Sequence, residues 1–349
     1  MQITNKIKKC ILNLKSYKPM LYKGKYKLDA NENSYEIPGP IKQKILKKII
    51  KSQLNRYPDP NATELKKLLC KILKVKEEML FIGNGSDEII SYLCQTFLEK
   101  NDAVIIPSPT FEMYKIISQI NDARIIEVPL DKNFDIDDRK IIKFARILNA
   151  KMIFISYPNN PTGNCFSVEK ILNIIKNTNS IIIIDEAYFE FSGKTFLKYL
   201  KKFNNLVILR TFSKAFSMAA LRIGYMIAAK EIVSELNKVR LPYNVNAISQ
   251  LFAVEIFKYG KIMKNFIKKI VTEREEMYKK ISKKFFVVKS EANFLFIKVN
   301  NINKAEKIFK KNKISVRVFK SGIAKDFIRI TIGKTNENAL VLNALNKIQ

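Results

Sequence analysis

Short runs of β-forming residues alternate with stretches of helical periodicity through the middle of the chain. Runs of four to six consecutive apolar residues are typical of strands that are buried on both faces of a sheet. Amphipathic helical patterns lie between most of these runs, for example over Ser86–Leu98, Thr110–Gln119 and Val168–Asn177. The alternation predicts an α/β fold with a mostly parallel central sheet and helices on both of its faces. The predicted strands are Met79–Gly83, Ala103–Ile106, Arg124–Val128, Met152–Ser156, Ile181–Asp185, Leu206–Arg210 and Gly224–Ala228.

Two segments flank this predicted sheet. Residues 1–35 form a polar, lysine-rich arm, and residues 246–349 open with a long helical pattern that runs from Ile248 to about Phe285. Short strand patterns follow that helix, which indicates a small α+β domain. We predict a large α/β domain over 36–245, a small domain over 246–349, and an arm, 1–35, that packs beside the small domain. The strand patterns of the small domain are Phe285–Val288, Phe294–Val299, Ile314–Val318 and Ile328–Ile332.

The chain contains no histidine, which excludes several kinds of active site at once. Ser-His and Cys-His nucleophilic sites, histidine general bases and His-ligated metal sites all need that residue. The four cysteines lie far apart and form no CxxC pair, so neither a zinc site nor structural disulfides are expected. With 349 residues, 47% of them apolar, the chain is large enough for an enzyme with a sizeable core and no metal.

The net charge of +31 raises the question of a nucleic-acid or membrane-surface partner. However, 53 of the 63 basic residues are lysines spread over the whole chain, and no basic block is interleaved with aromatic residues. Frequent Ile, Asn, Phe and Tyr with few Gly and Pro indicate A/T-rich codons instead. The apolar patch Cys10–Leu14 is too short for a signal sequence, and no run approaches the length of a membrane span. We therefore predict a cytoplasmic protein with no nucleic-acid or membrane partner.

The residues that follow each strand are the candidates for a site, because ligands bind beyond the carboxyl ends of parallel strands. After the first strand, Asn84–Glu88 combines a glycine turn with a helix start, which suits an anion site or an ordinary helix cap. After Met152–Ser156, the segment Tyr157–Gly163 contains two prolines and a glycine. That loop is rigid, and it either fixes the direction of its asparagine side chains or serves only as a turn.

Two further strand ends carry charged side chains. Asp185 follows four isoleucines, with Tyr188 three residues later, and a carboxylate at the end of so apolar a strand favours a functional role. The strand Leu206–Arg210 is followed by Ser213 and Lys214, and Arg222 lies eight residues further on. In the absence of histidine, a lysine that forms a Schiff base and a carboxylate that protonates a pyridine suit pyridoxal 5'-phosphate.

Nine short strings resemble the histidinol-phosphate aminotransferase family, which belongs to the fold-type I, class-II pyridoxal-phosphate-dependent aminotransferases. They occur in family order and span nearly the whole chain. The strings are Leu28–Asn33, Arg56–Pro60, Gly83–Glu88, Pro109–Tyr114, Pro158–Gly163, Asp185–Tyr188, Thr211–Phe216, Leu221–Gly224 and Ile328–Gly333.

The resemblance implies how the cofactor ring is held. Lys214 forms the Schiff base with pyridoxal phosphate and, once freed, acts as the general base. Asp185 binds the protonated pyridine nitrogen, and Asn160 and Tyr188 donate or accept hydrogen bonds at the ring hydroxyl. Phe111 stacks on the ring in a place where the family usually has tyrosine, so that stacking is kept and a phenol contact is lost.

The resemblance also implies how the anionic groups are held. Tyr57 is expected to reach the cofactor phosphate of the neighbouring subunit, which predicts a homodimer with shared sites. Arg317, Arg329 and Asn31 are expected to bind the substrate. The residues expected at the phosphate of their own subunit are Gly85, Ser86, Asp87, Ser213 and Arg222.

The function implied by the resemblance is a transamination in histidine biosynthesis. It interconverts L-histidinol phosphate and 3-(imidazol-4-yl)-2-oxopropyl phosphate, with glutamate and 2-oxoglutarate as the second pair of substrates. An aromatic amino-acid aminotransferase and a threonine-phosphate-type decarboxylase of the same fold would use the same cofactor residues, so both remain alternatives at this point.

Overall fold

The computed structural model describes residues 3–12, 14, 16 and 24–348 of the chain. Its largest element is a seven-stranded sheet with the strand order β2-β8-β7-β6-β5-β3-β4. Only β8 runs antiparallel to its neighbours, so the sheet is mixed and mostly parallel, as the sequence predicts. The strands are β2 (Leu80–Gly83), β3 (Ala103–Ser108), β4 (Arg124–Pro129), β5 (Met152–Ser156), β6 (Ile181–Asp185), β7 (Leu206–Thr211) and β8 (Gly224–Ile227).

The two faces of this sheet bury separate hydrophobic cores. In β5, for example, Ile153 and Ile155 point into one core, whereas Met152 and Phe154 point into the other. Successive side chains of a strand point to opposite faces, so a strand between two helical layers must be apolar throughout. This is the physical reason for the uninterrupted apolar runs in the sequence.

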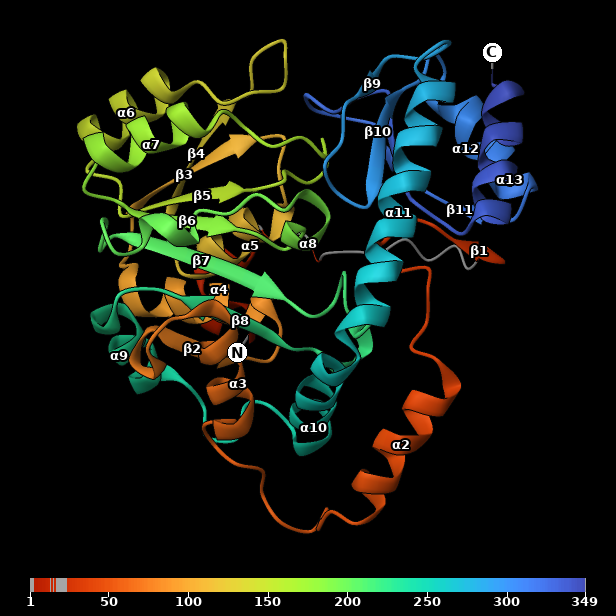
Figure 1. The fold of residues 1–349 in the computed structure, drawn as a ribbon. Coiled ribbons are helices and arrows are strands. Elements are labelled where there is room, and N and C mark those ends of the chain that lie inside the picture. Colours follow the sequence, from red (N-terminus) through yellow and green to blue (C-terminus); the bar gives the residue numbers. More distant parts are fainter. Residues whose placement is uncertain (1–2, 13, 15, 17–23, 349) are drawn as a thin grey trace.

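Helices cover both faces of the large sheet (Figure 1). The helices α4, α5 and α9 contribute to one core, and α3, α6, α7 and α10 contribute to the other. Their bounds are α2 (Gly39–Ile50), α3 (Thr63–Leu73), α4 (Ser86–Phe97), α5 (Glu112–Ile120), α6 (Asp138–Ile147), α7 (Val168–Asn177), α8 (Phe189–Ser192), α9 (Lys230–Val239) and α10 (Ala247–Ile256). No helix among the described residues is both long and apolar enough to cross a membrane.

A smaller sheet with the strand order β12-β13-β10-β9 lies beside the large one, together with three helices (Figure 1). All of its paired strands are antiparallel. Buried residues of β10, β13 and these helices form a third core. The elements are β9 (Val287–Val288), β10 (Phe294–Lys298), β12 (Arg317–Phe319), β13 (Phe327–Thr331), α11 (Gly260–Ile281), α12 (Ile302–Lys311) and α13 (Thr335–Asn346).

Two elements of the C-terminal part differ from the sequence-based prediction. The helical pattern expected from Ile248 to about Phe285 is divided into α10 and α11 by a 3-10 turn at Phe257–Tyr259. Gly260, a weak helix former, begins the second helix. The strand expected at Ile314–Val318 is also divided, because β11 (Ile314–Ser315) pairs with β1 (Tyr26–Lys27) while β12 pairs with β13.

The N-terminal arm touches both parts of the molecule. Its strand β1 pairs in parallel with β11, and Leu28 belongs to the core of the small sheet. In contrast, the short helix α1 (Lys9–Leu12) lies against α5, where the Cys10 thiol is 3.8 Å from the carbonyl of Ile120. The expected division at residues 35 and 245 stays a prediction, and α10, just after the second boundary, packs on α2 and α3.

Candidate active site

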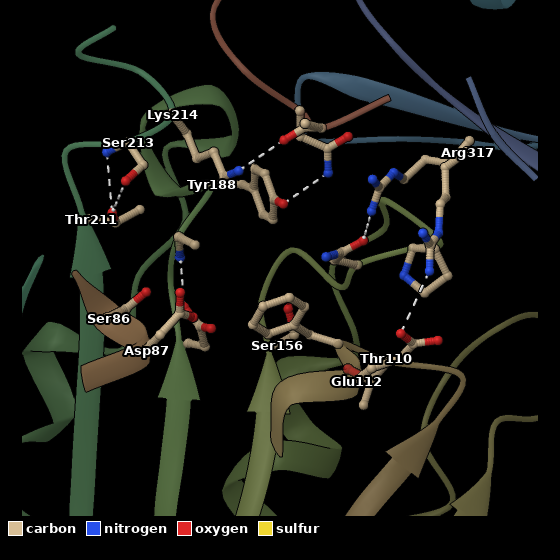
Figure 2. Close-up of a pocket in the computed structure, with 18 of the residues that line it drawn as sticks. Ser86, Asp87, Thr110, Glu112, Ser156, Tyr188, Thr211, Ser213, Lys214 and Arg317 are labelled. Atoms are coloured by element: carbon tan, nitrogen blue, oxygen red, sulfur yellow. Dashed lines mark hydrogen bonds and ion pairs between the residues drawn. The ribbon is translucent and has the colours of Figure 1, made fainter. Parts of the chain in front are cut away.

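A pocket lies at the carboxyl ends of β5, β6 and β7, where the small sheet and the arm face the large sheet. Figure 2 shows side chains from all of these elements converging on it. Twelve of the fourteen residues that the sequence places in the site line this pocket. They are Asn31, Ser86, Asp87, Phe111, Asn160, Asp185, Tyr188, Ser213, Lys214, Arg222, Arg317 and Arg329.

One side of the pocket is built as an anion cradle. The helix α4 begins at Ser86, directly after Gly85, whose φ of +86° favours glycine. A Cβ atom on Gly224 would lie 2.5 Å from the backbone nitrogen of Ser86, so glycine there allows β8 to approach the turn. Arg222 adds a guanidinium, which pairs with Asp87 at 3.1 Å and lies 3.5 Å from the hydroxyl of Ser213. A helix N-terminus with an adjacent arginine suits a phosphate group.

Asp185 ends β6 at the bottom of the pocket and is buried. The phenol of Tyr114 donates a hydrogen bond of 2.6 Å to Oδ2, and the backbone N–H of Ala187 donates one of 3.1 Å to Oδ1. Burial raises the pKa of Asp185 to about 6, although both of these hydrogen bonds act in the opposite direction. A buried carboxylate in this position is ready to hold a positively charged group of a ligand.

Lys214 lies on the loop after β7 and extends across the pocket. Its amine donates a hydrogen bond of 3.1 Å to the backbone carbonyl of Ala30, in the N-terminal arm. Burial, together with the nearby guanidinium of Arg329, lowers the pKa of Lys214 from 10.5 to about 8. A larger share of this amine is therefore neutral, and able to act as nucleophile or base, than of an ordinary lysine at the same pH.

A hydrogen-bonded network joins the arm to both sheets at the pocket. The side-chain amide of Asn31 donates a hydrogen bond of 2.9 Å to the phenol oxygen of Tyr188, and the backbone N–H of Asn31 donates one of 2.9 Å to Thr331. Arg329 donates to the side-chain oxygen of Asn160 and, at 2.6 Å, to the backbone carbonyl of Asp29. Burial raises the pKa of Tyr188 to about 12, so its phenol stays protonated at neutral pH.

The two candidate substrate arginines lie next to each other on neighbouring strands. Arg317 of β12 is the direct cross-strand partner of Arg329 of β13, and both line the pocket. Glu112, the first residue of α5, is 3.6 Å from Arg317 and is mostly exposed. Two guanidinium groups on the same side of the pocket provide planar, permanently charged donors for a polyvalent anion.

The chain matches the family model described as "Aminotransferase class I and II" over residues 23–345. It is 38% identical over 338 residues to the histidinol-phosphate aminotransferase of Clostridium novyi (strain NT), with 95% of each chain covered. It is 41% identical over 345 residues to the enzyme of the same name from Aquifex aeolicus (strain VF5), covering 97% of this chain and 96% of that one. The chain belongs to the class I and II aminotransferase family.

The fold agrees with this assignment. The structure of histidinol-phosphate aminotransferase from Sinorhizobium meliloti, in complex with pyridoxal-5'-phosphate, superposes with a TM-score of 0.90. It is 20% identical and covers 98% of this chain and 97% of that one, so this similarity concerns the fold. The chain is thus a fold-type I transaminase, as the sequence predicts. The roles of its individual site residues stay predictions.

Two of the predicted site residues do not line the pocket of this aminotransferase. Gly85 shapes the anion cradle from behind, because a Cβ there would lie 2.8 Å from the guanidinium of Arg222. Tyr57 lies elsewhere, 80% exposed, and stacks on Tyr243 with 4.4 Å between ring centroids. No group of residues suited to a metal ion occurs within the described part of the chain.

The fold brings into the pocket several residues that the sequence alone does not indicate. Tyr114 is the most significant, because its phenol contacts Asp185 directly. The periodicity of α5 places Tyr114 on the buried face of the helix with Ile117. A residue on that face is expected to pack in the core, so the pattern does not indicate a polar contact. Ala30 was missed because it contributes only a backbone carbonyl, which has no sequence signal. The other missed lining residues include Thr110, Glu112, Ser156 and Thr211.

Proposed function

We propose that this aminotransferase interconverts L-histidinol phosphate and its 2-oxo product, 3-(imidazol-4-yl)-2-oxopropyl phosphate, with glutamate and 2-oxoglutarate as the second substrate pair. The observation that carries the proposal is the cross-strand pair of Arg317 and Arg329, facing the same pocket as Lys214 and Asp185. A phosphate dianion needs more than one cation or a bidentate donor, and this pair supplies both. The names of the relatives support the same substrate.

The proposed cofactor is pyridoxal 5'-phosphate, and the residues of the pocket fit it. A phosphate matches the cradle formed by the N-terminus of α4 with Ser213 and Arg222. A protonated pyridine matches the buried carboxylate of Asp185, and an aldehyde carbon matches the amine of Lys214, with its lowered pKa. Phe111, at the start of α5, supplies an aromatic face for the ring.

Each of these residues has a defined task in the proposed reaction. When bound, the cofactor supplies an electron sink for the negative charge that develops on the substrate carbon next to nitrogen. Asp185 holds the positive charge at the ring nitrogen, and Asn160 and Tyr188 orient the ring at its hydroxyl. The neutral amine of Lys214 would take the proton from substrate Cα and deliver it to the carbon that was the aldehyde of the cofactor. Arg317 and Arg329 hold the substrate phosphate.

The pKa of Lys214 leads to a testable pH dependence. Because this pKa is lowered to about 8, the neutral fraction of the amine should rise with pH and level off above pH 8. The rate at which ligand-free protein captures pyridoxal phosphate should follow the same curve, measured by absorbance and corrected for the titration of the cofactor itself. An ordinary lysine would keep gaining about tenfold per pH unit up to pH 10. Such a continued rise would contradict the pKa assigned to Lys214.

The arginine pair makes a second prediction. Arg329→Lys and Arg317→Lys should each raise KM for histidinol phosphate, because lysine keeps the charge and loses the planar fork. The loss should be about 1.5–3 kcal/mol per missing charged hydrogen bond, whereas bound cofactor should be unchanged. Arg139→Lys, at an exposed position of α6, is the matched control. Unchanged kinetics in both pocket variants would remove the phosphate role from this pair.

A homodimer with shared sites is part of the proposal, as is a location in the cytoplasm. Tyr57 is exposed and lies outside the pocket of its own subunit, which supports a role in the site of a partner. Mixing Lys214→Ala chains with Tyr57→Ala chains should restore activity, because one of the two sites in each heterodimer is then intact. Full activity of the wild type as a monomer at low concentration would rule out sharing.

A direct assay tests the substrate assignment. Purified protein with pyridoxal phosphate should transfer the amino group of histidinol phosphate to 2-oxoglutarate much faster than that of phenylalanine. Release of CO2 from threonine phosphate, measured in parallel, should be absent. A preference for phenylalanine, or rapid decarboxylation, would overturn the substrate and leave the family assignment in place.

A further inference from the structure

Tyr114 lines the pocket beside Asp185 and has no task in the proposed reaction. It is fully buried, and its phenol donates a hydrogen bond of 2.6 Å to Oδ2 of Asp185. The ring itself is held firmly. It stacks on Phe154 with 4.9 Å between centroids and meets Phe111 edge to face at 5.5 Å. A phenol this well fixed can act on the carboxylate at a constant distance and angle.

The direction of the hydrogen bond determines what Tyr114 can do. Burial holds the pKa of the Tyr114 phenol well above its usual value, and so does the negative charge of Asp185. The phenol therefore remains a donor throughout the physiological pH range, and Asp185 remains the acceptor. A donor to a carboxylate stabilises the ionised form and lowers the affinity of that carboxylate for a proton.

We propose that Tyr114 is a positioning residue that keeps the proton shared between Asp185 and the cofactor on the ring nitrogen. This inference rests on the proposed binding of pyridoxal phosphate at Asp185. Asp185 is buried, so its charge is opposed by poor solvation, and the described structure provides it with one side-chain donor and one backbone donor. Without the phenol, the carboxylate binds a proton more tightly and competes with the ring nitrogen for it.

Phe111 connects Tyr114 to the expected position of the cofactor ring face. It precedes α5 by one residue, and its ring packs edge to face on Tyr114. One side chain thus contacts both the carboxylate expected at the ring nitrogen and the aromatic group expected on the ring face. Tyr114→Phe would remove only the hydroxyl and leave both aromatic contacts, so the variant separates the hydrogen bond from the packing.

The experiment uses the full-length protein loaded with pyridoxal phosphate labelled with ¹⁵N in the ring. The ¹⁵N chemical shift distinguishes a protonated ring nitrogen from a neutral one, and it does not depend on turnover. We expect the wild type at pH 8 to give the protonated value and Tyr114→Phe to move toward the neutral value. Turnover should fall by about 10-fold to 100-fold, the effect of one hydrogen bond to a charged group, with KM nearly unchanged.

Tyr92→Phe is the matched control. Tyr92 is a buried tyrosine of the same core, and its phenol is 3.3 Å from a different carboxylate, that of Glu88. This variant should keep the wild-type ¹⁵N shift. If Tyr114→Phe does not fold, a ring-fluorinated tyrosine at position 114 keeps the shape and donates more strongly, which should raise the pH at which the ring nitrogen loses its proton.

The outcomes separate this inference from the proposed function. A wild-type ¹⁵N shift in Tyr114→Phe, or no change with the fluorinated tyrosine, would overturn the role of Tyr114 and leave the cofactor assignment intact. A neutral ring nitrogen in the wild type, or no cofactor bound through Lys214, would overturn the proposed function itself. A fall in turnover without a change in the ¹⁵N shift would also reject the role proposed for Tyr114.

Discussion

Replacing Lys214 with alanine should abolish the covalent link to pyridoxal phosphate and lower turnover by about 10⁴-fold, the upper end of the range for loss of a general base. Lys214 is the lysine whose amine lies in the pocket with its pKa lowered to about 8. Borohydride reduction of the wild type should fix the cofactor on the peptide that contains Thr211–Phe216. In the variant, cofactor held by the phosphate cradle should wash out on dialysis.

The control for this experiment is Lys238→Ala, at an exposed position of α9 whose amine pairs with Glu235. That variant should retain the reducible link and normal turnover. Recovery of the reduced cofactor on a peptide without Lys214 would refute the assignment. So would measurable single-turnover transfer in Lys214→Ala at a rate near that of the wild type.

Replacing Asp185 with asparagine should lower turnover by at least about 10²-fold, the loss expected when one preorganised charge is removed from an active site. Binding of the cofactor should weaken by about 1.5–3 kcal/mol, the loss of one charged hydrogen bond, because the phosphate cradle remains. The measurements are steady-state rates and a cofactor titration on the same preparations. Near-normal turnover in the variant with cofactor bound would exclude the proposed role of Asp185.

The same substitution should not lower the stability of the ligand-free protein, although it lowers turnover. The pKa of Asp185 is raised from 3.8 to about 6 in the folded protein, so the stability linked to this group is present below pH 3.8 and is lost as pH rises through about 6. At pH 7 the ligand-free wild type carries a buried charge that asparagine lacks. Ligand-free Asp185→Asn should therefore unfold at the same or a higher temperature than the wild type, as measured by calorimetry.

The positions of most pocket residues could be predicted from the sequence because they follow strands with a strong signal. Asp185 comes after an uninterrupted run of isoleucines, and Lys214 comes three residues after β7. In a parallel sheet the ends of neighbouring strands meet at one edge, so the fold itself brings these residues together. To identify the cofactor that these residues suit, the additional constraint that histidine is absent was needed.

The remaining part of the site could not be predicted in this way, because its residues meet through tertiary pairing alone. Nothing in the sequence indicates that the strand pattern Ile314–Val318 divides at Val316 so that its two halves join different sheets. Tyr114 falls on an apolar helix face, where burial is the simpler interpretation, and its partner Asp185 is 71 residues away. Contacts of this kind depend on where the helix lies on the sheet, which periodicity does not reveal.

The contacts between the arm and β13 have a consequence for how the protein is made. Asp29 binds Arg329 and Asn31 binds Thr331, and each pair is separated by 300 residues in the chain. A ribosome that has synthesised the seven-stranded sheet has produced Lys214 and Asp185, but not the strand that anchors the arm over them. The pocket can therefore close only at the end of translation. Chains released early would carry a lysine and a carboxylate that no arm covers, and we expect them to retain cofactor poorly.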